Sequence, residues 1–141
     1  MSEKIVFLDA ATVDYGDIDF SAISNHGELV SYPVTSQGDV IKLCSDATII
    51  ITNKVTIDRE IIAGCTRLKM IAEAATGYNN IDIIEAKNRG IVVANVPGYS
   101  TTTVAQLTMA FILALSTNLL KYNNAAHDGS WSRSDIFTLG T

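Results

Sequence analysis

The chain has 141 residues, of which 48 % are hydrophobic and 18 % are charged, and its formal net charge is −5. This length is that of one domain with a sizeable core, and the acidic balance excludes the basic surface that binds nucleic acid or an anionic membrane, so neither is an expected partner. The two cysteines, Cys44 and Cys65, lie in apolar stretches and are expected to be free buried thiols, and the absence of a signal-peptide pattern predicts a cytoplasmic protein.

Strand-like and helix-like segments alternate along the chain. The predicted strands are short apolar runs over residues 5–8, 28–32, 47–52, 68–72 and 91–94. The predicted helices lie between them, over residues 17–26, 36–44, 56–63 and 80–89, and Gly27, Gly64 and Gly90 mark three of their ends. Runs this apolar are typical of a parallel sheet that is buried on both sides. The predicted fold class is therefore α/β, with helices on both faces of a parallel five-stranded sheet.

A longer apolar segment, residues 104–120, follows the last predicted strand. Polar residues interrupt it at Gln106, Thr108 and positions 116–118. It therefore falls short of the roughly 20 mainly apolar residues that cross a bilayer. We expect a long helix that starts near Thr101 and is buried against protein, and no membrane span.

Ligands of parallel sheets bind beyond the carboxyl ends of the strands. The residues predicted at that edge are Asp9, Asn53, Lys54 and the segments 75–78 and 95–97. Thr76 and Gly77 are the best candidates for binding an anion, because glycine lets the backbone approach a ligand and the following helix contributes its positive end. The Lys54 ammonium would add a charge at the same edge. A small carboxylate fits, since its oxygens can accept two backbone N–H bonds and one bond from an ammonium.

Each of these residues also has a purely structural interpretation. Gly77 would serve only to adopt a positive φ in a turn, and Lys54 would be a solvated loop residue. Asp9 would cap the turn that follows it. Asn80 and Asp82 would simply start the next helix.

Several motifs of catalysis and nucleotide binding are missing from the sequence. It contains no G-x-G-x-x-G, no P-loop, no G-x-S-x-G and no visible metal-binding cluster. His26 and His127 are the only histidines, and because neither follows a predicted strand we do not expect them to be catalytic. The residues alone therefore indicate a small-anion-binding α/β domain.

A series of motifs extends over nearly the whole chain. They are residues 6–9, 51–54, 75–79, 95–101, 104–106 and 129–132, with Asp82 and Gly90 between them. In this order and at this spacing they resemble the D-isomer-specific 2-hydroxyacid dehydrogenases, and most of all the glycerate dehydrogenase or hydroxypyruvate reductase branch. Two positions depart from the usual pattern: Gln106 replaces a glutamate, and residues 116–118 replace an arginine-containing helix end.

The resemblance implies a flavodoxin-like substrate-binding domain over residues 1–100. It implies that residues 101–141 form an interdomain helix and the start of a Rossmann cofactor-binding domain. In the family, the loop that matches Thr76 and Gly77 binds the substrate carboxylate through backbone N–H groups, and the loop of Asn53 and Lys54 lines the same cleft. The implied substrate is a small 2-keto or 2-hydroxy carboxylate.

The resemblance also implies roles at the start of the long helix. Ser100 matches a position near the substrate, and Thr101 and Val104 match positions near the nicotinamide of NAD or NADP. The helix over residues 101–121 would contribute to a homodimer. The family's catalytic arginine, acidic residue and histidine, and its G-x-G-x-x-G, would follow Thr141.

Two hypotheses follow. In the first, the chain is the N-terminal part of an NAD(P)-dependent 2-hydroxyacid oxidoreductase that reduces hydroxypyruvate to D-glycerate, or acts on a similar 2-keto acid. In the second, it is a shortened, non-catalytic remnant that binds small carboxylates or associates with itself. In either case the chain alone is expected to be inactive and to hold no cofactor.

Overall fold

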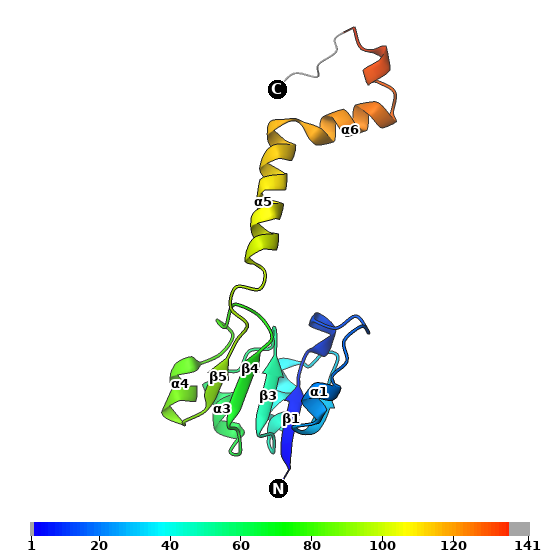
Figure 1. Ribbon diagram of the computed structural model, residues 1–141. Coiled ribbons are helices and arrows are strands. Elements are labelled where there is room, and N and C mark those ends of the chain that lie inside the picture. The colour runs from blue at the N-terminus through cyan, green and yellow to red at the C-terminus, as the bar shows by residue number, and fades with distance from the viewer. Residues whose placement is uncertain (1, 136–141) are drawn as a thin grey trace. The chain divides into compact units, whose positions relative to one another are not determined.

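Five short segments pair into one parallel sheet in the computed structural model, which describes residues 2–135 (Figure 1). The order of the strands is β2-β1-β3-β4-β5. Their bounds are β1 (Glu3–Phe7), β2 (Gly27–Ser31), β3 (Ile49–Thr52), β4 (Met70–Glu73) and β5 (Val92–Ala94). The predicted parallel five-stranded sheet is confirmed. Because all strands run in one direction, their carboxyl ends share one edge, where the loops predicted to bind a ligand emerge.

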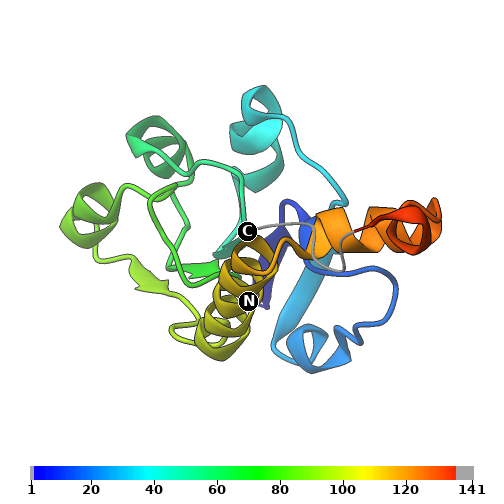
Figure 2. The ribbon, with the colours of Figure 1, turned by 90° about the horizontal axis from the view of Figure 1, so that it is seen from above.

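Helices lie on both faces of the sheet. They are α1 (Ser21–Ser24), α2 (Val40–Cys44), α3 (Arg59–Gly64) and α4 (Ile83–Asn88), with 3-10 turns η1 (Ala10–Thr12) and η2 (Gln37–Asp39). Figure 2 shows α2, α3 and α4 along one face and α1, in blue, on the other. The core lies under α2–α4 and includes the buried side chains of Val6, Leu8, Ile50 and Ile71.

Both cysteines belong to this core, as predicted. Cys44 and Cys65 are buried and free. Burial raises the pKa of the Cys44 thiol to about 12 and that of Cys65 to about 11. At neutral pH they are therefore thiols without nucleophilic character.

The face that carries α1 is covered unevenly. Near β1 and β2 it is closed, and Phe7 meets Phe20 edge to face with 5.7 Å between ring centroids. Toward β5 it opens: Met70 and Ala72 are only half-buried, and Val92 is 60 % exposed. The apolar residues of β3–β5 that point away from α2–α4 are thus partly in contact with water.

Local hydrogen bonds explain where the helices depart from the predicted bounds. The helix predicted over residues 17–26 shrinks to α1, because the Asp14 carboxylate accepts bonds from the amides of Gly16, Asp17 and Ile18 and holds a turn there. The helices predicted from residues 56 and 80 start at Arg59 and Ile83. Asp58 and Asp82 cap α3 and α4 by accepting bonds from Ile61 N and Glu85 N.

Tyr99–Thr141 forms a second compact unit, separate from Met1–Gly98. It contains α5 (Thr101–Ser116), α6 (Leu119–His127) and η3 (Trp131–Arg133), and residues 136–141 of the predicted cofactor-domain segment lie outside the described residues. The prediction of one helix over residues 101–121 is wrong in its length. Asn118 adopts a left-handed φ of 52°, and α6 leaves α5 at a bend of 65°.

Within the described part of the chain, no single helix is long and apolar enough to cross a membrane. The bent pair α5 and α6 passes the criterion only when the two helices are taken together, by length and composition.

Gly27 generates a prediction about stability. It does not end a helix, as its position suggested, but opens β2 opposite Glu3, and a Cβ there would lie 2.4 Å from the Glu3 carbonyl oxygen. We expect Gly27→Ala to lower the free energy of unfolding by about 1–3 kcal/mol, because backbone must shift. Gly38→Ala is the matched control, since its Cβ would meet no atom within 4 Å. Urea unfolding that shows equal stability for the two variants would contradict this.

Candidate functional site

A buried aspartate organises the loop after β3. The Asp9 side chain follows β1 and is only 3 % exposed. Its carboxylate accepts bonds from three successive amides: Asn53 N at 2.9 and 3.1 Å, Lys54 N at 2.5 Å and Val55 N at 3.1 Å. Three converging N–H donors compensate the cost of burying the charge. Asp9 therefore fixes the backbone that carries Lys54.

The structural interpretation of Asp9 as a cap for its own following turn is wrong. Its side chain makes no capping bond to η1. That turn is held instead by Thr12, whose hydroxyl donates to the Asp9 carbonyl and accepts from Asn53 Nδ2 at 2.9 Å. Asn53 thus links the loops after β1 and β3 and is committed to structure by both its backbone and its side chain.

Lys54 is exposed at the rim of a cavity of about 280 Å³. The other lining residues are Asp9, Thr12, Val34, Thr35, Gln37 and Val55. Among residues 2–135, no carboxylate forms an ion pair with the Lys54 ammonium. The structure therefore offers a positive group beside a cavity with several hydroxyl and amide groups, which suits a small anionic ligand.

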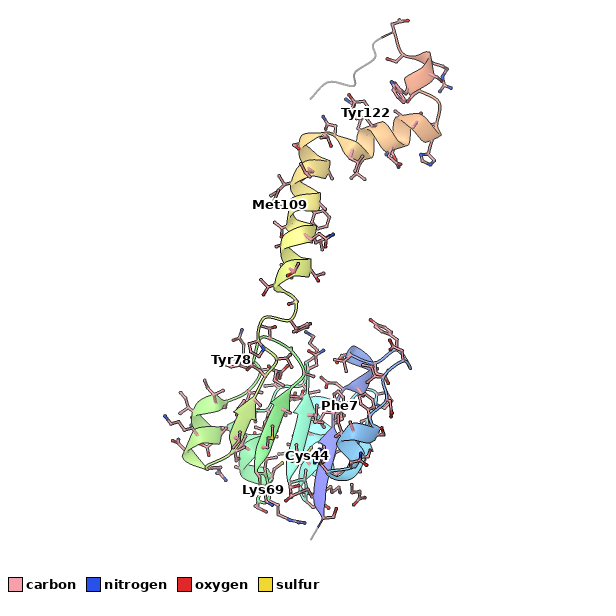
Figure 3. The ribbon with its side chains drawn as sticks, viewed as in Figure 1. Phe7, Cys44, Lys69, Tyr78, Met109 and Tyr122 are labelled. Atoms are coloured by element: carbon pink, nitrogen blue, oxygen red, sulfur yellow. The ribbon has the colours of Figure 1, made fainter. Side chains whose placement is uncertain are left out.

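Thr76 and Gly77 lie in the exposed loop after β4. This loop is tied to the one after β5: Asn95 Nδ2 donates to the Thr76 carbonyl at 2.7 Å, and the Thr76 hydroxyl donates to the Val96 carbonyl at 3.0 Å. Tyr78, the next residue, lies at the carboxyl edge of the sheet, opposite the edge of Lys69 (Figure 3). The loop after β4 is therefore exposed to solvent but held in place by hydrogen bonds to the loop after β5.

The conformational interpretation of Gly77 is wrong, because its φ is not among the positive ones. A Cβ at this position would meet no atom within 4 Å. Open space above an exposed backbone leaves room for a ligand to approach. The expected help from the next helix is weaker than predicted, since α4 starts only at Ile83 and Asp82 already caps it.

The sequence-predicted residues do not all meet in one cavity. Lys54 lines the cavity described above, whereas Tyr78 lines a separate hollow of about 300 Å³ with Ile83, Val93 and Asn95. Ser100, Thr101 and Val104 belong to the second unit, where Ser100 precedes α5 and its carbonyl accepts from Val104 N at 2.9 Å. Their role beside a substrate or nicotinamide stays a prediction.

Sequence reasoning missed Glu73 at this edge, and for Asn80 it offered only a structural role. Glu73 ends β4 and is 2 % exposed, and its Oε2 accepts from Asn80 Nδ2 at 2.9 Å. Asn80 was interpreted as a helix start, yet its amide also donates to the Val55 carbonyl at 3.2 Å. The available signal was the alternation in β4, which places Glu73 on the same buried face as Ile71.

Burial raises the pKa of the Glu73 carboxyl, and the nearby Asp9 charge acts in the same direction. The hydrogen bond from Asn80 and the Lys54 charge act against these effects. The two histidines lie elsewhere, and the described residues contain no cluster of three metal-ligating side chains. The edge thus offers anion-binding donors and a buried acid.

The sequence model of the family described as "D-isomer specific 2-hydroxyacid dehydrogenase, catalytic domain" matches residues 5–137. The chain belongs to this family. The hydroxypyruvate reductase of Blautia hydrogenotrophica is 37 % identical over 131 residues, which cover 91 % of this chain and 41 % of that protein. The glycerate dehydrogenase of Methylorubrum extorquens is 30 % identical over 137 residues, which cover 97 % and 43 %.

A comparison with solved structures finds the same fold. The D-lactate dehydrogenase of Aquifex aeolicus, solved with NAD and lactic acid, superimposes with a TM-score of 0.79 at 24 % identity, covering 97 % of this chain and 40 % of that one. This likeness shows the fold. The chain spans about two fifths of the length of the curated relatives that it matches.

Asp9→Asn tests the anchoring of the Lys54 loop. The variant keeps the volume of the side chain but turns an amide N–H₂ toward backbone donors, so we expect a loss of about 2–4 kcal/mol in the free energy of unfolding. Asp14→Asn is the matched control, because Asp14 also accepts from three amides but is only half-buried. Chemical denaturation should give a much smaller loss for the control. Equal losses would show that burial of Asp9 is not what matters.

Glu73→Gln tests the buried acid through pH. A carboxyl whose pKa is raised on folding binds more protons in the folded state, so its contribution to stability is full below the ordinary pKa of 4.5 and is lost as pH rises through the folded value. We expect the variant and the native chain to differ least below pH 4.5, with the variant gaining relative stability toward neutral pH. Urea unfolding across this range measures the difference, and a constant difference would refute it.

Proposed function

We propose that this chain is the substrate-binding part of an NAD(P)-dependent 2-hydroxyacid oxidoreductase that reduces hydroxypyruvate to D-glycerate, or acts on a similar 2-keto acid. The observation that carries the proposal is the family match over residues 5–137. Its chemistry agrees with the edge of the sheet, where the exposed Lys54 ammonium, without an ion pair among residues 2–135, and an open glycine backbone face solvent. The names of the two relatives support hydroxypyruvate and glycerate as the first compounds to test.

In this proposal, the chain's own residues hold the substrate and leave the redox chemistry to the cofactor. The backbone N–H groups around Thr76 and Gly77 donate to the carboxylate of the keto acid, and the Lys54 ammonium adds a charge at the side of the β3 loop. Asp9 and Asn53 keep that loop in place. NAD or NADP supplies or removes the hydride when it is bound.

The described residues fit only the nicotinamide end of such a cofactor. Thr101 and Val104 are exposed in the first turn of α5, next to Ser100, so hydroxyl and methyl groups are available there. The sequence contains no G-x-G-x-x-G to hold a pyrophosphate. We therefore assign these residues to the nicotinamide. A cytoplasmic location stays a prediction.

A second candidate function, self-association through α5, rests on a different observation. No residue of α5 is buried, and its apolar residues point in every direction around the helix. The side chain of Met109 projects from the middle of it (Figure 3). Leu107, Phe111 and Leu115 form one stripe and are each more than half exposed. Contiguous exposed apolar side chains often mark interaction surfaces.

The carboxylate site predicts that the chain binds glycerate or hydroxypyruvate weakly, near the millimolar range, or about −4 kcal/mol. Gly77→Val should abolish binding, because its side chain would fill the open space above the backbone. Lys54→Ala should weaken binding less. The measurement is a titration that follows backbone amide shifts. The site assignment fails if amides 76–79 stay still while others move.

The α5 stripe predicts a dimer or larger assembly. Phe111→Glu combined with Leu115→Glu should give a monomer, because the charges would be desolvated at the contact. Gln106→Glu is the control, since it adds a charge to an exposed polar position of the same helix. Light scattering coupled to size exclusion gives the mass. A native chain that is monomeric at high concentration would count against self-association.

A further inference from the structure

Burying the carboxylate of Glu73 at this position costs free energy of folding. Its Oε1 has no hydrogen-bond partner among the described residues. Ile71, two residues earlier on the same face, shows that an apolar side chain would be buried there without that cost. The charged groups near Glu73 are Asp9, after β1, and Lys54, after β3. What the carboxylate contributes must therefore come from the bond that it does make.

That bond fixes the amide of Asn80. Asn80 Nδ2 donates to Glu73 Oε2 at 2.9 Å and to the Val55 carbonyl at 3.2 Å, so both N–H bonds of the amide have an acceptor. Val55 is the residue whose N–H is held by Asp9 at 3.1 Å. The loop that carries Lys54 is thus held at two groups of Val55: its N–H donates to Asp9, and its carbonyl accepts from Asn80.

The backbone continues this connection between the two loops. Ile57 N donates to the Asn80 carbonyl at 2.7 Å, and Asp82 N donates to the Ile57 carbonyl at 2.9 Å. Ile57 and Ile81 consequently form an isolated parallel bridge outside the five strands. Asn80 is therefore the point where residues 53–57 and residues 76–82 are joined by side chain and backbone together.

We propose that Glu73 and Asn80 are positioning residues that hold the Lys54 loop and the Thr76–Gly77 loop in one fixed arrangement, which sets the affinity of this edge for a small carboxylate. The connection itself follows from the hydrogen bonds above, and only the identity of the ligand rests on the proposed function. The role of Glu73 is that of an acceptor, which orients the Asn80 amide. A glutamine can take that role, whereas a leucine cannot.

The test is hydrogen exchange on the full chain. In Glu73→Leu, we expect the amides of Ile57 and Asp82 to exchange about tenfold faster, as for the loss of one buried hydrogen bond, while the Ile71 amide in β4 keeps its rate. Glu73→Gln should keep all three rates close to native. Asn80→Asp should behave like Glu73→Leu, because it places an acceptor against two acceptors, and it serves if the leucine variant does not fold.

Glu3→Leu is the matched control, since Glu3 also has a carboxylate oxygen with no hydrogen-bond partner in the described part of the chain. It lies at the start of β1 and pairs with Lys69 at 2.6 Å. It should leave the loop amides unchanged. The inference is overturned if the disrupting variants leave Ile57 and Asp82 at native rates, if Ile71 accelerates equally with them, or if Glu73→Gln opens the loops as leucine does.

A titration with glycerate separates this inference from the proposed function. If the native chain shifts no amide of residues 53–55 or 76–79, the proposed function fails, while the exchange rates still decide whether the loops are joined. If the native chain binds and Glu73→Leu opens the loops, glycerate affinity should fall several-fold and recover in Glu73→Gln. Unchanged affinity with open loops would overturn the positioning role.

Discussion

The candidate site depends on one interaction, the acceptance of three successive backbone N–H groups by the buried Asp9 carboxylate. β1 ends at Phe7 and β3 at Thr52, and parallel pairing brings the two ends together. Asp9 fixes the loop after β3 in place. The buried carboxylate and the buried amides would each lose free energy without a hydrogen-bond partner, and here they satisfy one another. The Lys54 side chain takes its place from this loop, and Asn80 attaches the loop after β4 to it.

Much of the fold follows from pattern alone, because the strands of a parallel sheet are mainly apolar and turn residues separate them from the helices. The errors arise where a short-range bond competes with helix formation. Asp14 captures three amides and leaves only Ser21–Ser24 helical. At the other end, the hydroxyls of Ser116 and Thr117 both donate to the Leu113 carbonyl just before the break at Asn118. Hydropathy does not register such bonds.

The location of the candidate site was predictable from the sequence, whereas its hydrogen bonds were less so. The topology places Asp9, Lys54 and Gly77 at one edge, and strand ends in the sequence indicate this. The partners of Asp9 lie more than forty residues away, and those of Asn80 lie in the loop after β3 and at the end of β4. Contacts of this kind depend on tertiary packing, so a single sequence offers only the hint of a lone glutamate in an apolar strand.

The uneven cover of the sheet bears on how the first unit can be used by itself. Because α1 covers only β1 and β2, the side chains of Met70, Ala72 and Val92 form a partly exposed apolar strip. This strip ends at the open edge of β5. An unpaired strand edge beside apolar side chains is a template for stacking into larger aggregates. Threonine in place of Val92 would keep the preference for a strand and make the strip more polar. It is therefore the first change to make when residues 1–98 are used as a free-standing scaffold.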